Sequence, residues 1–216
     1  MVANEASSGG PGTLQNYNAA VDLIERNLTA RPDKIAYIDD NGRYSFTELA
    51  DRVNRCANAL CGLDLPMEAR VIVCLTDSID FPSLFLGAIK PGLVPVPVNT
   101  LLTTNDYNFM LRDSRAQALI ISEPQLPTFK PILDDQPFLK HVVVSGGNPS
   151  GYPRLAHLLA AAGPNFPAAP PRDLVLLSSP NSTAVIFFAG LGFLHLSIAI
   201  PGFAKQRWEG YLTLFF

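Results

Sequence analysis

The alternation of strand and helix patterns between residues 70 and 162 constrains the fold of this 216-residue chain more than any other feature. The run RVIVCL, residues 70–75, is continuous and rich in β-branched residues, which is typical of a strand buried on both faces of a parallel sheet. Strand-like and helix-like segments then follow each other four times, and helices supply the crossovers that parallel strands need. The sequence therefore predicts an α/β fold with a mostly parallel sheet and flanking helices.

Local signals fix several element boundaries. The Asn-Gly pair at residues 41–42 favours a β-hairpin, because both residues tolerate positive φ. Ser45 with Glu48, and Thr103 with Asp106, have the spacing of helix capping boxes. The helix after Ser45 is expected to bury one apolar stripe, formed by Leu49, Val53, Cys56 and Leu60.

The segment FLGAIKPGLVPVPVNTLLT, residues 85–103, places three prolines and two glycines in an otherwise apolar run. Proline has no backbone N–H and cannot donate to an interior ladder, so the valine–proline alternation predicts an edge strand. We expect Val94, Val96 and Val98 to point to one face while Pro95 and Pro97 point to the other. Such a stiff apolar edge would suit an interface.

Composition narrows the class of protein. Hydrophobic residues make up 48% of the chain and charged residues 16%, and the net charge of −3 offers no basic face for nucleic acid. The three cysteines, Cys56, Cys61 and Cys74, lie in apolar segments without metal-type spacing, which favours reduced core thiols in a cytoplasmic protein. The polar residues 1–15 are expected to form a disordered lead-in.

No catalytic or metal-binding constellation is legible in the sequence. His141, His157 and His195 stand apart from one another and are interpreted as structural residues. The pairs at residues 39–40 and 134–135, each Asp-Asp, are typical of turns rather than of an acid–base dyad. Tyr107, Phe109 and Met110 are expected to serve helix packing rather than to form an aromatic binding patch. We therefore predict no metal site and no catalytic residue in this chain.

Two motifs resemble core motifs of the AMP-forming adenylating superfamily, which includes the acyl- and aryl-CoA synthetases. The first is YSFTELADRVNRCANAL, and the second is LGAIKPGLVPVPVNTLL. The segment NTLLTTNDYNFML is most similar to benzoate-CoA ligases, and the likeness extends over about residues 16–144. The matching positions are scaffold residues rather than reacting groups: Tyr44, Phe46, Glu48, Leu49, Lys90, Gly92, Val94, Pro95, Asn99 and Thr100.

The resemblance implies a reaction and its cofactors. In this superfamily ATP and Mg²⁺ activate a carboxylate, here aromatic or aliphatic, as an acyl-adenylate, and coenzyme A then displaces AMP to give a thioester. A glycine-rich loop of the form S-S-G-S-T-G-x-P-K-G holds the phosphates. The segment at that place is LLSSPNSTAV, in which proline and asparagine replace glycines and no lysine follows until Lys205. Pro180 lacks an N–H and fixes its own φ, so this segment is expected to be a polar turn rather than a phosphate loop.

The weak remnant of that loop consists of Ser178, Ser179, Ser182 and Thr183. We assign no other cofactor-binding residue in this chain. The family's adenine-binding segment, ribose-binding aspartate and C-terminal catalytic lysine have no counterpart in the chain. The resemblance thus implies a ligase framework without its ATP site.

The end of the chain is unusually apolar. Residues 174–204 contain no Asp, Glu, Lys or Arg, and residues 184–203 are about long enough to cross a membrane as a helix. Three explanations remain open: a truncation, internal deletion, or frame or splice change near Pro171; a membrane segment; and a buried strand pair. We favour the first.

The sequence therefore divides into a lead-in at 1–15, an α/β N-terminal subdomain of an AMP-dependent synthetase/ligase at 16–170, and a divergent apolar tail at 171–216. We predict that this chain alone does not adenylate. The alternatives are a non-catalytic interaction module that associates with a full-length paralogue, and a tail-anchored membrane protein.

Overall fold

The computed structural model of the chain describes residues 18–148 and 151–166. Its centre is a four-stranded sheet in which every neighbouring pair is parallel and the strand order is β4-β3-β5-β6. The strands are β3 (Arg70–Cys74), β4 (Val94–Pro97), β5 (Ala118–Ser122) and β6 (His141–Ser145). The predicted parallel α/β fold is therefore confirmed.

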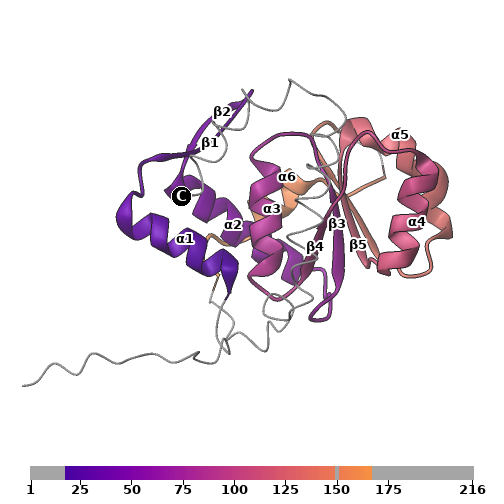
Figure 1. Ribbon diagram of the computed structural model, residues 1–216, viewed down its shortest axis with the longest axis horizontal. Helices are drawn as coiled ribbons and strands as arrows, with labels where there is room; N and C mark the ends of the chain where they lie inside the picture. The colour runs from indigo at the N-terminus through magenta and orange to yellow at the C-terminus, as the bar shows by residue number, and fades with distance from the viewer. Residues whose placement is uncertain (1–17, 149–150, 167–216) are drawn as a thin grey trace, which may run out of the picture.

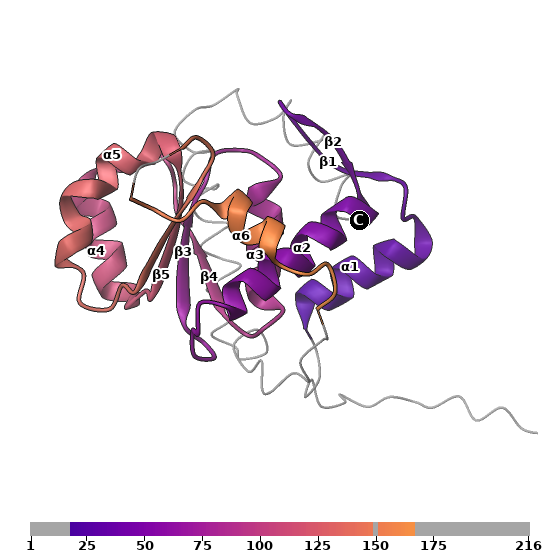
Figure 2. The same ribbon diagram turned by 180° about the vertical axis from the view of Figure 1, so that it is seen from behind.

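Helices cover both faces of this sheet (Figures 1 and 2). One face packs against α2 (Phe46–Cys61), α3 (Asp80–Ile89) and α6 (Leu155–Ala161). The other packs against α4 (Thr104–Ser114) and the short α5 (Leu126–Phe129), which lies between the 3₁₀ turns Glu123–Gln125 and Lys130–Asp135. Prolines near the start of each of these three elements keep the helical segments short.

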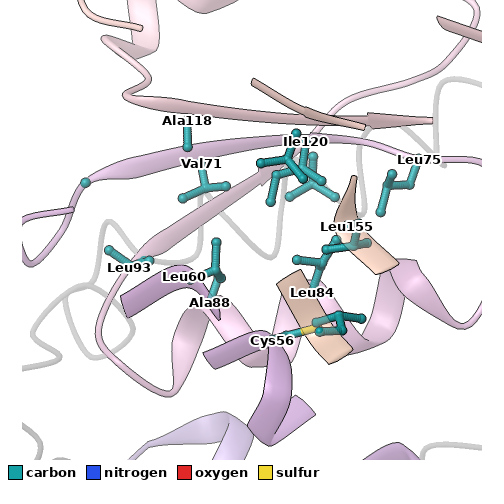
Figure 3. Close-up of a cluster of buried hydrophobic side chains, with 14 residues drawn as sticks. Cys56, Leu60, Val71, Leu75, Leu84, Ala88, Leu93, Ala118, Ile120 and Leu155 are labelled. Atoms are coloured by element: carbon teal, nitrogen blue, oxygen red, sulfur yellow. The ribbon is translucent and has the colours of Figure 1, made fainter. Parts of the chain in front are cut away.

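The core between the sheet and α2, α3 and α6 is built from buried apolar side chains (Figure 3). Val71 and Val73 of β3 point into it, while Ile72 and Cys74 of the same strand point to the opposite face, as the two-residue period of a strand requires. Side chains buried in this core include Cys56, Leu60, Leu84, Ala88, Ala118, Ile120, Val143 and Leu155.

A third layer lies outside α2 and α3. It consists of α1 (Ala19–Ala30) and the antiparallel hairpin of β1 (Ile35–Asp39) and β2 (Gly42–Ser45). Ile24 of α1, Val53 of α2 and Ile79, which precedes α3, share one buried cluster. The hairpin predicted at residues 41–42 is confirmed, and so is the capping box of Ser45 with Glu48.

The proline-rich strand lies at the edge of the sheet, as predicted. Among the described residues β4 has β3 as its single neighbour. Val96 and Val98 pack against the core on the α4 side, and Pro95 lies in register with Val71, which faces the opposite core. The chain then turns into α4, whose capping box of Thr103 with Asp106 is also confirmed.

The cysteine prediction was wrong at one position. Cys56 and Cys74 are buried, but Cys61 is exposed because it lies on the last turn of α2, away from the buried stripe. Every helix in the part of the chain that the structure describes is too short or too polar to span a membrane. The predicted lead-in at 1–15, the apolar tail at 171–216 and His195 lie outside the described residues.

Candidate functional site

The carboxyl ends of β3 and β5 form the place where this fold is expected to bind a ligand. The chain leaves β3 toward β4 on one side and leaves β5 toward β6 on the other, so the connections diverge between these two strands. Open α/β sheets bind ligands in the crevice outside such a switch point. The contacts of the residues at the carboxyl ends of these strands therefore indicate whether a nucleotide fits there.

Two hydroxyl residues occupy the switch point itself. Thr76 follows β3, and its backbone N–H donates to Ser122 Oγ at 2.9 Å. The two hydroxyl oxygens lie 3.1 Å apart. Ser122 is buried at the end of β5. The strands thus satisfy each other's polar groups, which leaves the Thr76 N–H unavailable to a phosphate.

Asp39, the last residue of β1, places its carboxylate at the N-terminus of α3. Its carboxylate accepts the backbone N–H of Ile79 at 2.9 Å, and also those of Asn41 at 2.8 Å and Gly42 at 3.0 Å. Burial opposes ionisation, but these hydrogen bonds outweigh it and lower the pKa of Asp39. Helix N-termini attract anions, and here a carboxylate of the hairpin already provides the negative charge.

A second carboxylate, that of Asp80, neutralises the guanidinium of Arg52 at the same end of the sheet. Asp80, in the first turn of α3, forms an ion pair with Arg52 of α2 through Oδ1. Its Oδ2 accepts the hydroxyl of Ser145, at the end of β6, at 2.6 Å. Tyr44 lies beside this group, and burial together with the charge of Asp39 raises the pKa of its phenol. The cluster ties the hairpin, two helices and the sheet together.

The turn after β6 is glycine-rich but is also filled. Gly146 and Gly147 adopt φ of +80° and +51°, a backbone form that glycine permits and that occurs in phosphate-binding turns. The carboxyl group of Glu123, however, lies where a side chain on Gly147 would stand. A third carboxylate therefore covers the turn.

These residues do not fit the triphosphate of ATP or the pyrophosphate of coenzyme A. Asp39, Asp80 and Glu123 would repel an anion, and Arg52 is already paired. Within residues 18–148 and 151–166, no group of three or more His, Cys, Asp or Glu side chains is placed to hold a metal ion. The sheet edge is instead a polar cluster in which Asp39 and Asp80 already bind groups of this chain.

The predicted scaffold residues do not form one site. Tyr44 belongs to the polar cluster, Glu48 accepts the N–H and hydroxyl of Ser45, and Leu49 is buried against α1 and the hairpin. Lys90 lies at the other end of the sheet, because α3 runs antiparallel to the strands. Its Nζ donates to Asn54 Oδ1 at 2.6 Å, and burial lowers its pKa, partly offset by the charge of Glu25.

The remaining scaffold residues shape the β4 region. Gly92 has φ of +85°, which lets the chain turn from α3 into the sheet, and Val94 and Pro95 begin β4. The carbonyl of Asn99 accepts the buried Tyr107 hydroxyl at 2.7 Å, and its Oδ1 accepts the N–H of Leu101 at 2.9 Å. Thr100 is half-buried in this turn.

Sequence reasoning missed the cluster of Arg52, Asp80 and Ser145. These residues lie 28 and 65 positions apart along the chain, and no motif connects them. The weak phosphate-loop remnant Ser178, Ser179, Ser182 and Thr183 lies outside the described residues. A shallow depression of about 590 Å³ on the exposed side of α4 is lined by Asn105, Asn108, Phe109, Arg112 and Asp113.

Comparison with known proteins identifies the family of this chain. A profile described as "AMP-binding enzyme" matches residues 24–189. The benzoate–CoA ligase of Thauera aromatica is 53% identical over 160 residues, which are 73% of this chain and 30% of the relative. The 4-hydroxybenzoate–CoA/benzoate–CoA ligase of Rhodopseudomonas palustris is 41% identical over 148 residues, 68% of this chain and 28% of the relative.

Solved structures that resemble this chain are also CoA ligases. A benzoate CoA ligase from Burkholderia xenovorans has a TM-score of 0.64 and 36% identity, over 71% of this chain and 30% of that one. An anthranilate CoA ligase in complex with anthranoyl-AMP has a TM-score of 0.70 and 33% identity, over 74% of this chain and 31% of that one. The chain thus spans less than a third of the length of these relatives.

Proposed function

Because the chain belongs to the family of AMP-binding enzymes, we propose that it provides the N-terminal α/β framework of a benzoate-CoA ligase-type enzyme. The whole reaction would be the ATP- and Mg²⁺-dependent conversion of an aromatic carboxylate to its coenzyme A thioester. The 53% identity to the Thauera aromatica benzoate–CoA ligase is the observation that favours benzoate-like substrates. The free thiols Cys56, Cys61 and Cys74 favour a reducing compartment such as the cytoplasm.

We further propose that the 216-residue chain alone does not form an adenylate. The support is the sheet edge, where the carboxylate of Asp39 accepts the Ile79 N–H and Asp80 forms an ion pair with Arg52. The sequence adds that Pro180 and Asn181 stand where the family's loop has glycine. The framework role and the missing activity are therefore two separate claims.

A chimera tests the framework role. Residues 18–166 would replace the matching segment of the Thauera aromatica benzoate–CoA ligase. The assay measures benzoyl-CoA formation as the loss of the free thiol of coenzyme A. The proposal expects benzoate-dependent thioester formation by the chimera. A chimera that has the circular dichroism of the parent ligase and yet makes no thioester would refute the framework role.

The polar cluster at the carboxyl ends of the strands also favours a second candidate function. In that case the chain would be a non-catalytic module that binds a full-length ligase of the same family. Gel filtration of the chain with and without such a ligase distinguishes the two. Co-elution with the intact ligase supports the interaction module, and separate elution at every concentration tested rules it out.

A further inference from the structure

The edge of β4 that faces away from β3, called the free edge here because no other described strand pairs with it, has an unusual pattern of backbone groups. In a parallel pair, alternate residues of a strand direct their N–H and C=O groups toward the neighbouring strand, and the residues between them direct theirs outward. The N–H of Val94 donates to Ala69 O and the N–H of Val98 donates to Val73 O, both at 3.0 Å. Val94, Val96 and Val98 therefore face β3, and residues 95 and 97 face outward.

Both outward-facing residues are proline. Pro95 and Pro97 have carbonyl oxygens but no N–H, so the free edge offers acceptors and no donors along the length of the strand. A β-strand laid along this edge would find no partner for its own carbonyl groups there. Each of those carbonyls would lose water without gaining a hydrogen bond, which is unfavourable.

Side-chain packing holds this pattern in register. Val96 and Val98 contribute to the core on the α4 side, and Pro95 is buried beside Val71 on the opposite face. A shift of one residue would expose the valines' N–H groups at the edge, but it would also turn every side chain to the wrong face. The donor-free edge is thus fixed by the same contacts that hold the strand.

The opposite edge of the sheet is protected in another way. In β6 the outward N–H of Val144 donates to Pro153 O at 2.9 Å, so the segment before α6 covers it. Exposed strand edges are the usual templates for unwanted pairing between chains, and prolines on the edge or covering segments are known ways of blocking it. Prolines thus block strand pairing at the β4 edge, and a covering segment blocks it at the β6 edge.

We propose that β4 is an edge closed to strand addition, and that Pro95 and Pro97 keep two copies of this chain from pairing through their sheets. The valines and prolines of the VPVPV segment thus divide two tasks. The valines fix the strand on β3, and the prolines remove the donors that a second copy would need.

The test restores the donors. The variant Pro95→Val/Pro97→Val of the full chain adds two outward N–H groups with side chains suited to a strand. The matched control, Pro32→Val/Pro66→Val, makes the same two replacements at exposed positions outside β4. Light scattering after size exclusion, over a concentration series, measures self-association, and hydrogen exchange locates the protected amides.

We expect the edge variant to self-associate at least about tenfold more tightly than the parent chain and the control, since a single hydrogen bond is worth about fivefold. Protection should appear at residues 94–98. If the double variant fails to fold by circular dichroism, Pro97→Val alone, at an exposed position, takes its place. Association equal to that of the parent or of the control would overturn the proposal, as would protection of 94–98 by self-association of the parent chain.

Discussion

Gly87 lies at the closest approach of α2 and α3, and its replacement by alanine is expected to destabilise the chain. A methyl group there would stand 3.0 Å from the carbonyl oxygen of Val53 and 3.2 Å from the backbone nitrogen of Ala57. The Cβ of Cys56 would lie closer still, well inside the carbon–carbon contact distance of about 3.5–4.0 Å. Because these are backbone and Cβ atoms, no rotamer change relieves the overlap.

Two effects of opposite sign decide the magnitude. Alanine in a helix interior is favoured over glycine by about 0.5–1 kcal/mol. Overpacking of a close helix contact costs about 1–3 kcal/mol, and the rigid neighbours place this site at the upper end. We therefore expect Gly87→Ala to lower the free energy of unfolding by about 2 kcal/mol.

Urea denaturation followed by far-UV circular dichroism measures this change. The control is Gly62→Ala at the end of α2, where φ is −65° and the nearest atom to the new methyl group is the Ala59 carbonyl oxygen at 3.3 Å. It should change stability by no more than about 0.5 kcal/mol. The double variant Cys56→Gly/Gly87→Ala should be less destabilised than the sum of its two single variants, because one of the close contacts is removed. A Gly87→Ala chain as stable as the parent would refute the packing argument.

Three further predictions concern polar groups. Asp39→Asn should destabilise the chain by about 1–2 kcal/mol at neutral pH. Because the folded pKa of Asp39 is lowered, this stability is present above its unfolded pKa of about 3.9 and is lost as pH falls through the folded pKa. Urea titrations at several pH values should therefore show a shallower acid dependence for the variant than for the parent. Asp80→Asn should cost about 1–2 kcal/mol by leaving Arg52 half-buried without its partner, and an unchanged urea midpoint would count against the cluster. Lys90→Met should keep stability within about 1 kcal/mol, because the lost hydrogen bond to Asn54 is offset by the relief of a buried charge. Since the folded pKa of Lys90 is lowered, the parent should gain stability as pH rises from that value toward about 10.4, and a variant that keeps this gain would contradict the assignment.

Local signals in the sequence predicted much of the fold. The Asn-Gly turn at 41–42, the two capping boxes and the edge position of the proline-rich strand depend on interactions within a few residues, and all are confirmed. The buried stripe of α2 was also predicted, because its period follows from helix geometry alone. Cys61 was placed wrongly because an apolar neighbourhood in sequence does not reveal which face of a last helical turn meets the core.

The polar cluster at the sheet edge could not be predicted in the same way. Arg52, Asp80 and Ser145 come from three elements, and their contacts exist only when the hairpin, the helices and β6 pack together. The same holds for Asp39, whose sequence context indicates a turn but not its bond to the N–H of Ile79. Sequence patterns report local geometry, and such long-range hydrogen bonds leave no period or spacing to read.

The central claim is that this chain has the framework of a carboxylate-activating ligase but does not itself activate a carboxylate. Exchange of labelled pyrophosphate into ATP, with benzoate and Mg²⁺ present and the intact Thauera aromatica ligase as positive control, measures adenylate formation directly. The account predicts no benzoate-dependent exchange by the purified 216-residue chain. Exchange that requires both the chain and benzoate would contradict it.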